Sequence, residues 1–191
     1  MKRYILLYFL LLSLASATAQ TPEKHLSFMG MQMVGTSDVF ASRLKKKGFT
    51  QKKKIESITY FYGKFANEFV ELELIASPIT NTVCKIVVYF PFKKTWKSLK
   101  EDYLNKRKLY SLKYFRTDDF SFFSSPYDEG DGYELRAVQE GKCDYASFYE
   151  EEGGHLSLEI SPKQKVKVSY EDDINMLIAK KELERKAYND I

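Results

Sequence analysis

The fold is decided by the segment Ile58–Tyr110, which has the sequence ITYFYGKFANEFVELELIASPITNTVCKIVVYFPFKKTWKSLKEDYLNKRKLY. Its first part contains three stretches with the pattern of β-strands: Ile58–Phe65, Phe69–Ala76 and Val83–Phe90. Apolar and acidic residues alternate over residues 70–74, and this period of two is typical of a strand with one buried face. The third stretch is almost continuously apolar, which indicates a central strand. An amphipathic helix follows and begins near Thr95.

The flanking segments extend this pattern. Thr36-Ser37-Asp38 has the hydroxyl cap and acidic first turn of a helix start, and Gly48 suits the end of that helix. The helix after Thr95 has a predicted buried stripe that excludes Lys106 and consists of Trp96, Leu99, Tyr103 and Tyr110. Alternation predicts further strands at residues 120–122, 133–138, 143–150, 156–160 and 166–170. A last helix begins at Asp172 or Asp173 and runs towards Tyr188, with an apolar side formed by Ile174, Leu177, Ile178 and Leu183.

Residues 49–54 lead from the first helix into the strands and complete a first set of four, so the order is a helix and four strands, a helix and four or five strands, and a closing helix. The order predicts an α+β fold in which helices pack on one or two antiparallel sheets. It also predicts an internal duplication, with two tandem repeats of a helix and four strands. The seam falls near Pro91, so the expected halves are residues 27–92 and 93–191, which form either one domain or two.

The N-terminus has the pattern of an export signal. Lys2-Arg3 is a basic start, residues 4–14 are apolar, and Ala17-Thr18-Ala19 suits a cleavage site. Residues 1–19 are therefore predicted to be a secretory signal peptide, because the apolar run is too short to span a membrane. A flexible lead-in, residues 20–26, would begin the mature chain. The expected location is the periplasm or the extracellular space.

The composition excludes a disordered or fibrous chain, since 44% of the residues are hydrophobic and 29% are charged. Loss of Lys2 and Arg3 lowers the formal net charge of +4 by two, to +2, so the net charge indicates no particular partner. Aromatic residues make up 15% of the chain. Tyr and Phe fit pleated surfaces, which favours a sheet-rich fold.

The chain has two cysteines, Cys84 and Cys143. In an oxidising compartment a disulfide between them would constrain the unfolded chain by about 4 kcal/mol. The alternative is two separate buried thiols, because Cys84 shares a strand face with Ile86 and Val88, and free cysteine is among the most buried residue types. Both alternatives stay open at this point, because the sequence does not give the Cα separation that a disulfide requires.

Seven cations fall within the twelve residues from Arg43 to Lys54. In a cytosolic protein such a run suggests nucleic-acid binding, but the export signal argues against a nucleic-acid partner. One alternative is an anionic envelope surface or polysaccharide bound by Lys52, Lys53 and Lys54. A solvated charged surface is the favoured alternative, because a helix C-terminus accommodates lysines 45–47 and charge runs are commonly solvated.

No motif in the sequence supports catalysis or metal binding. The acidic loop Asp128–Gly132 lacks the ligand spacing of a calcium loop, and its Asp-Gly pair is typical of a hairpin turn. His155, Ser157 and Glu159 share a strand face, but residues two apart are separated by about 6.6 Å along a strand, which is too far for a catalytic relay. The histidines and cysteines show no paired zinc spacing. We therefore expect no enzyme, no cofactor and no metal.

Four aromatic rings are concentrated in residues 118–127, with the sequence DDFSFFSSPY. Phe120 and Phe122 suit a core strand and are expected to pack. Phe123 and Tyr127 are expected to be surface anchors for a partner or ligand, because Phe and Tyr provide rigid contact area.

Phe28-x-Gly30 precedes the first helix, and Tyr170-Glu171-Asp172 precedes the last. In these features the chain resembles small exported bacterial proteins of uncharacterised families. The order of a helix and four strands, present twice, is similar to the tandem-repeat architecture of beta-lactamase inhibitor proteins. This resemblance covers most of the mature chain in topology but no specific motif. It implies an α+β fold with a sheet surface free to bind a partner, and no inhibitory residue carries over.

These observations lead to three hypotheses. The first is an exported, non-enzymatic protein that binds a partner protein or envelope component through an open sheet face. The second is a binder of a small molecule or glycan, with a Tyr/Phe-lined cleft between the halves. The third is a hydrolase. Exposed Tyr and Phe on the sheet face would favour the first hypothesis, and a concave aromatic pocket of several hundred Å³ would favour the second.

Overall fold

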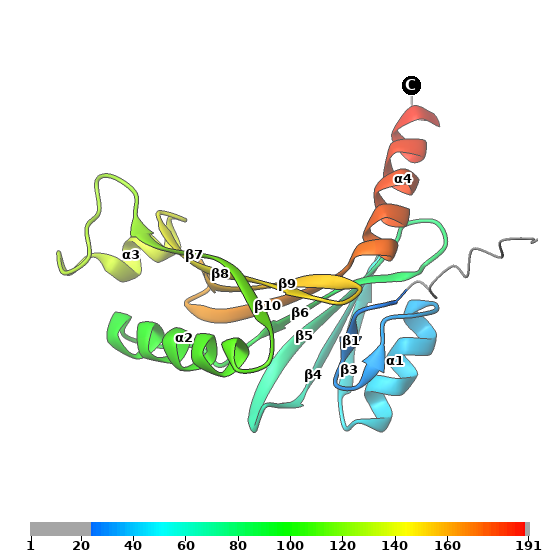
Figure 1. The fold of residues 1–191 in the computed structure, drawn as a ribbon, viewed down its shortest axis with the longest axis horizontal. Helices are drawn as coiled ribbons and strands as arrows, with labels where there is room; N and C mark the ends of the chain where they lie inside the picture. Colours follow the sequence, from blue (N-terminus) through cyan, green and yellow to red (C-terminus); the bar gives the residue numbers. More distant parts are fainter. Residues whose placement is uncertain (1–23, 190–191) are drawn as a thin grey trace, which may run out of the picture.

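The computed structural model describes residues 24–189. The expected signal peptide, residues 1–19, and the start of the lead-in lie outside the described residues. Within residues 24–189 the chain forms an eight-stranded antiparallel sheet, a two-stranded hairpin and four helices. The predicted α+β class, with an antiparallel sheet, packed helices and a C-terminal helix, is confirmed (Figure 1).

The first half consists of a hairpin, a helix and four strands. β1 (Ser27–Phe28) pairs with β2 (Met31–Gln32), and α1 (Ser37–Lys46) follows. Gly48 comes directly after the C-cap of α1 with a φ of +92°, which is the left-handed conformation that commonly ends a helix. The four strands form a meander of β3 (Thr50–Ile55), β4 (Ile58–Phe65), β5 (Glu68–Ala76) and β6 (Val83–Tyr89).

The second half repeats the helix and four strands, with one inserted helix. α2 (Trp96–Ser111) begins after Thr95, whose side-chain oxygen accepts a hydrogen bond from the Ser98 N–H. The strands are β7 (Phe115–Phe123), β8 (Cys143–Glu151), β9 (Gly154–Ser161) and β10 (Lys165–Asp172). The inserted helix, α3 (Glu134–Gln139), lies between β7 and β8, and α4 (Asp173–Asn189) follows β10.

The strand order in the sheet is β3-β4-β5-β6-β10-β9-β8-β7. Each half is a meander whose last strand lies at the centre of the sheet. There β6 pairs antiparallel with β10, so that Val88 lies opposite Val168. The two halves therefore share one continuous sheet, which leaves β3 and β7 as its two edges.

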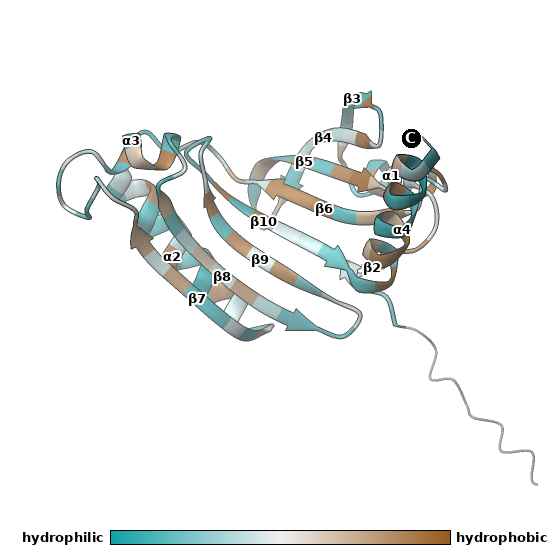
Figure 2. Ribbon diagram, turned by 90° about the horizontal axis from the view of Figure 1, so that it is seen from above, coloured by the Kyte–Doolittle hydropathy of each residue, from teal (hydrophilic) through white to brown (hydrophobic). Residues whose placement is uncertain are grey.

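One face of the sheet is covered, and the other is open. α1 contacts β3 and β5, whereas α2 contacts β9 and β10. Both helices lie on the same side of the sheet in Figure 1, and α4 rises on the other side. A single core cluster runs through both halves and includes Phe40, Leu72, Tyr103 and Leu158. Hydrophilic and hydrophobic residues alternate along several strands in Figure 2, as expected for a sheet with one buried face.

Residues 133–138 were expected to form a strand, and this prediction is wrong because Tyr133 caps α3 and residues 134–138 belong to it. The buried residues of α3 are the neighbours Ala137 and Val138. Adjacent side chains leave opposite faces of a strand, whereas in a helix they can both face the core. The preceding Asp131 does not form a hairpin turn. Its Oδ1 instead accepts a hydrogen bond from the Tyr133 N–H at 2.7 Å and leads the chain into the helix.

The side that α4 buries differs from the predicted apolar side. Leu177 is 53% exposed and Leu183 is 56% exposed, whereas Asn175 and Glu182 are buried. The buried polar side chains bind backbone groups of the first half: Asn175 Nδ2 donates to Met33 O and Val83 O, and Glu182 accepts from the N–H groups of Ile79 and Thr80. The prediction of the packed side is therefore wrong for Leu177 and Leu183, whereas Ile174 and Ile178 are half-buried, and these polar contacts add to the apolar burial of Ala179.

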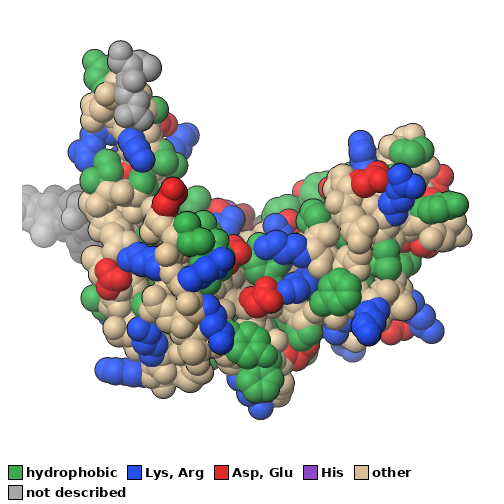
Figure 3. Space-filling model, turned by 180° about the vertical axis from the view of Figure 1, so that it is seen from behind, with side chains coloured by type: hydrophobic (Ala, Val, Ile, Leu, Met, Phe, Trp, Pro, Cys, Tyr) green, Lys and Arg blue, Asp and Glu red, His purple; other side chains and the backbone are tan. Residues whose placement is uncertain are grey.

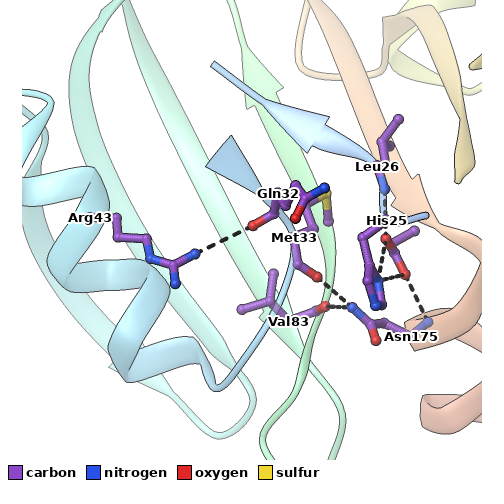
Figure 4. A network of polar contacts seen from close by, with 8 residues as sticks. His25, Leu26, Gln32, Met33, Arg43, Val83 and Asn175 are labelled. Atoms are coloured by element: carbon purple, nitrogen blue, oxygen red, sulfur yellow. Dashed lines mark hydrogen bonds and ion pairs between the residues drawn. The ribbon is translucent and has the colours of Figure 1, made fainter. Parts of the chain in front are cut away.

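The last residues of the expected flexible lead-in are packed against the sheet. Leu26 is 1% exposed, and its N–H donates to Asp172 Oδ2 at 2.8 Å. His25 Nδ1 lies 3.0 Å from the same oxygen, beside Asn175 at the start of α4 (Figure 4). A Cβ atom on Gly153 would lie 2.3 Å from Lys24 O. Glycine is therefore required where the lead-in crosses the β8–β9 turn, and residues 24–26 form part of the fold.

Candidate functional site

A cleft of about 460 Å³ lies between the two halves. The first half contributes the β1–β2 turn, the β4–β5 turn and Phe90, which follows β6. The second half contributes one side of α2 and Tyr170 of β10. Pockets that hold small molecules commonly have volumes of about 300–1,000 Å³, so the cleft is large enough for such a ligand.

The apolar wall of the cleft is built from aromatic rings that support one another. Phe65 stacks on the buried Phe28 with 5.3 Å between ring centroids, and Phe90 lies 6.1 Å from Phe65. Tyr170 packs edge-on against Phe28 at 5.1 Å. Each ring of the wall therefore has an aromatic neighbour at a favourable distance, and these contacts stabilise its position.

The polar end of the cleft contains the buried Lys106. This side chain is 7% exposed, and its Nζ lies 2.8 Å from Glu68 Oε1 and 2.5 Å from Asp102 Oδ1. The same nitrogen lies 4.1 Å from the ring centroid of Phe90. A buried cation needs such partners because desolvation is costly. The earlier prediction that Lys106 lies outside the buried stripe is wrong, since Leu99, Tyr103, Lys106 and Tyr110 follow one another at helical spacing.

The opposite end of the cleft contains tyrosine hydroxyls. The hydroxyl oxygens of Tyr110 and Tyr170 lie 2.7 Å apart. Burial raises the pKa of both phenols above the ordinary value, so they stay neutral and act as hydrogen-bond donors and acceptors. Lys113 lies nearby, with its Nζ 4.7 Å from the ring centroid of Tyr114.

Two hairpin turns shape the rim of the cleft. Met29 has a φ of 52° and Ala66 has a φ of 48°, and both residues line the cleft. Two-residue hairpin turns of this kind require positive φ at the first turn position. Their usual occupants are Asn, Asp or Gly, so Met29 and Ala66 give no sequence signal for the turns that they form.

The open face of the sheet is a second candidate surface. Ion pairs link its central strands, with distances of 2.5 Å for Lys85–Glu171, 2.8 Å for Lys165–Glu71 and 3.0 Å for Lys167–Glu159. Figure 3 shows a hollow between α4 and the part of the molecule that carries α3. Towards the β3 edge, Tyr62 and Phe69 stack with 5.7 Å between centroids and are 41% and 61% exposed.

The two predicted aromatic anchors are not free surface residues. Tyr127 is 9% exposed, and its hydroxyl donates to Glu140 Oε2 at 2.7 Å. Phe123 is half-buried, with its ring centroid 5.2 Å from that of Trp96 and 6.0 Å from that of Tyr145. Both side chains therefore contribute to packing around α2 and α3.

Phe120 and Phe122, which were expected to pack, are 41% and 51% exposed. They point to the open face, where Phe120 contacts Phe148 edge-on at 6.0 Å between centroids. The prediction for these rings is wrong because period two alone does not say which set of residues faces the core. In this strand Phe120 and Phe122 belong to one set and Phe123 belongs to the other, so both sets contain an apolar residue.

Lys52, Lys53 and Lys54 are exposed on the edge strand β3. Lys52 Nζ lies 5.5 Å from the ring centroid of Tyr62, and Lys54 Nζ lies 3.1 Å from Asp38 Oδ1. None of the three lines the cleft between the halves, so the lysines and the cleft are separate features.

Cys84 and Cys143 are both free and buried. Their strands β6 and β8 are separated by β10 and β9. At about 4.8 Å per strand spacing they lie about 14 Å apart, which exceeds the roughly 7 Å limit for the Cα atoms of a disulfide. The disulfide alternative does not fit this arrangement. Burial raises the pKa of Cys84 to about 11 and that of Cys143 to about 12, which makes both thiols unreactive at neutral pH.

His155 contacts carboxylates of its own surroundings. Its Nδ1 lies 2.9 Å from Asp173 Oδ1, and its Nε2 lies 3.3 Å from Glu171 Oε2. The Ser157 hydroxyl donates to Glu159 Oε1 at 2.6 Å, so the expectation that side chains two apart on this strand are too distant to bond is wrong for this pair. These contacts give His155 an acidic partner, but they do not join it to the serine that a hydrolase of this kind would need.

Within residues 24–189, no group of three or more His, Cys, Asp or Glu side chains is arranged to hold a metal ion. The same part of the chain contains no helix with the length and apolar character to cross a membrane. No family model, curated protein or solved structure matches the chain. The resemblance to exported bacterial proteins and to beta-lactamase inhibitor proteins therefore stays a prediction.

Proposed function

We propose that the protein is an exported, non-enzymatic binding protein that holds a small amphipathic molecule, such as a glycan fragment, in the cleft between its halves. The observation that carries this proposal is the cleft itself, whose lining combines aromatic rings with the ion-paired Lys106, Glu68 and Asp102. Ligand sites typically combine a mainly apolar lining with a few placed polar groups.

The charged end favours a ligand with hydrogen-bond donors. Lys106 occupies one oxygen of Glu68 and one of Asp102, and each carboxylate can accept further hydrogen bonds. Asp102 Oδ2 is buried without a hydrogen-bond partner among the described residues, and Lys93 Nζ forms an ion pair with it at 3.6 Å. The rings of Phe65 and Phe90 would contact the apolar side of the ligand, for example the C–H face of a sugar ring.

Two matched leucines at the C-terminal end of α2, Leu109 within the helix and Leu112 at its C-cap, allow a direct test. Leu109 is 62% exposed and lines the cleft, whereas Leu112 is 78% exposed and lies outside its lining. We expect Leu109→Arg to fill the cleft and weaken ligand binding at least about tenfold, while Leu112→Arg leaves the affinity within about twofold. The affinity is measured with a neutral apolar fluorescent dye, which is then displaced by a panel of glycan fragments.

The two variants also separate the possible outcomes. Loss of dye binding in Leu109→Arg alone, with displacement by glycans, supports the proposal. Absence of dye binding in the native protein contradicts it, as does an equal loss in both variants. Both substitutions are at exposed positions, so we expect both variants to fold. The thermal unfolding midpoint of each variant tests this and shows whether a loss of binding reflects unfolding.

A second candidate function is the binding of a partner protein or envelope component by the open sheet face. The exposed stack of Tyr62 and Phe69 favours it, because exposed aromatic patches commonly mark interaction sites. Cross-linking of the native protein in the bacterial envelope would identify such a partner. The hypothesis requires that Phe69→Lys abolish the specific cross-link and that Leu109→Arg leave it intact.

A further inference from the structure

The two edges of the sheet differ in how they are protected. β3 carries lysines at positions 52–54 and a bulge between Gln51 and Lys53, and both features hinder pairing with another strand. β7 has a bulge and charges only in its first part, around Arg116 to Asp119. Its second part, Phe120–Phe123, has no charge, and residues 115–122 are all exposed. The edge at β7 is therefore open to a further strand.

The unpaired backbone groups of β7 belong to its odd-numbered residues. The Ser124 N–H donates inward to Lys142 O at 2.8 Å, whereas the Asp119 N–H is satisfied by the side chain of Asp118 at 2.8 Å. Backbone groups alternate between the two sides of a strand. Ser121 and Phe123 therefore direct their N–H and C=O groups away from β8. Strand pairing is the interaction that satisfies such a row of donors and acceptors.

We propose that β7 pairs antiparallel with β7 of a second copy of this chain, about a two-fold axis at Ser121. In this register Ser121 lies opposite Ser121 of the second copy, and the two residues exchange both backbone hydrogen bonds. Phe120 lies opposite Phe122 of the second copy on the open face, and the symmetry produces this pair twice. Aromatic cross-strand pairs of this kind are favourable.

We place a second copy of this chain at the β7 edge because β7 is complementary to itself in this register. Residues 120–122 meet the same residues of the second copy, and Asp119 lies opposite the uncharged Phe123 of the second copy, so no charge is placed opposite a like charge. Asp118 already satisfies the Asp119 N–H, which restricts the new pairing to the uncharged end of the strand. The interface would leave the cleft accessible, because no residue of β7 lines it. The inference is therefore independent of the proposed ligand.

Two exposed residues at opposite edges provide a matched test. Phe122 on β7 is 51% exposed, and Ile55 on β3 is 50% exposed. Sedimentation velocity of the native protein from micromolar to millimolar concentration should show a monomer–dimer equilibrium. We expect Phe122→Lys to weaken the dimer at least about tenfold, because it removes two aromatic pairs and places lysines near each other. Ile55→Lys should leave the dissociation constant unchanged.

The register is tested separately with single cysteines. Cα atoms of hydrogen-bonded antiparallel pairs lie about 5.5 Å apart, which suits a disulfide. Ser121→Cys should therefore form a covalent dimer on mild oxidation, whereas Ser42→Cys on the exposed side of α1 should not. Cys84 and Cys143 are buried and do not compete. A monomer at all concentrations overturns the proposal, and so does a dimer that tolerates Phe122→Lys or fails to cross-link through position 121.

Discussion

In the first half of the sheet, the ten-residue α1 buries Phe40, Ala41 and Leu44 together with Ser37. In the second half, the sixteen-residue α2 buries only Leu99, Tyr103 and Lys106. The longer helix thus buries fewer residues, and two of its three buried side chains carry polar atoms. The halves share a helix followed by a four-stranded meander, but the contact between helix and sheet is mainly apolar in one half and partly polar in the other.

The polar contact beneath α2 is a connected network. The hydroxyl oxygens of Tyr103 and Ser147 lie 2.6 Å apart, and the Ser147 hydroxyl donates to Asp119 Oδ1 at 2.8 Å. Arg107 Nη1 lies 2.7 Å from Asp119 Oδ2. Because Ser147 uses its proton for Asp119, the Tyr103 hydroxyl donates to Ser147, and it also lies 3.4 Å from Asp119 Oδ1. The difference between the halves shows that one topology can be stabilised by apolar burial or by a satisfied buried network.

The largest effect is expected where the contact is apolar. Phe40 is 0% exposed, so Phe40→Ala should lower the free energy of unfolding by about 3–5 kcal/mol, through lost burial and the cavity that remains. Its neighbour Val39 is 48% exposed, and Val39→Ala should change the stability by less than about 0.5 kcal/mol. Denaturant unfolding monitored by circular dichroism measures both. A loss below about 1 kcal/mol for Phe40→Ala would show that α1 contributes little to the fold.

A smaller effect is expected in the network beneath α2. Ser147→Ala leaves the Tyr103 hydroxyl and Asp119 without their shared partner, and we expect a loss of about 1–3 kcal/mol. Ser157→Ala is the matched control, since Ser157 also lies on a strand and donates to a carboxylate, Glu159, but on the open face. Water can replace that hydrogen bond, so the control should lose less than about 0.5 kcal/mol. Equal losses in the two variants would contradict a special role for the network.

The strands and helix starts could be predicted from the sequence because their signals are local. The alternation over residues 70–74 indicated β5, and Thr95 and Gly48 marked the start of α2 and the end of α1. No local sequence pattern indicated which side of α4 is buried. Asn175 is buried because it donates to Val83 O, which is 92 positions away in the chain. Only the folded structure brings these two groups together.

The cleft was predictable only in general terms. A Tyr/Phe-lined space between the halves followed from the aromatic content and the suspected duplication, but its residues come from separate turns and strands. Lys106 is the exception, because it lies three residues after Tyr103 and four before Tyr110. The helical spacing alone placed it on the buried stripe. Because Lys106 is charged, it was predicted to lie outside the buried stripe. Asp102, one turn earlier in the helix, provides the carboxylate partner for the buried ammonium group.

The smallest and most specific effect is expected from the Tyr103 hydroxyl. Burial is the main reason that the pKa of Tyr103 rises from 10.0 to about 12. At neutral pH, Tyr103→Phe should lose about 0.5–1.5 kcal/mol, the usual contribution of one hydrogen bond. Between pH 10 and 12 the unfolded chain ionises this phenol while the folded protein keeps it protonated. The raised pKa of Tyr103 therefore makes its full contribution to the free energy of unfolding below pH 10. This contribution is lost as the pH rises to about 12.

The stability difference between the native protein and Tyr103→Phe should therefore shrink as the pH rises through this range. Denaturant unfolding at a series of pH values measures it, and subtraction of the two curves removes the titration that both chains share. Tyr188 is 76% exposed, so Tyr188→Phe should change the free energy of unfolding at neutral pH by less than about 0.5 kcal/mol. A constant difference for Tyr103→Phe would mean that its hydroxyl is not buried in the folded protein. The contact between α2 and the sheet would then be less polar than the buried network indicates.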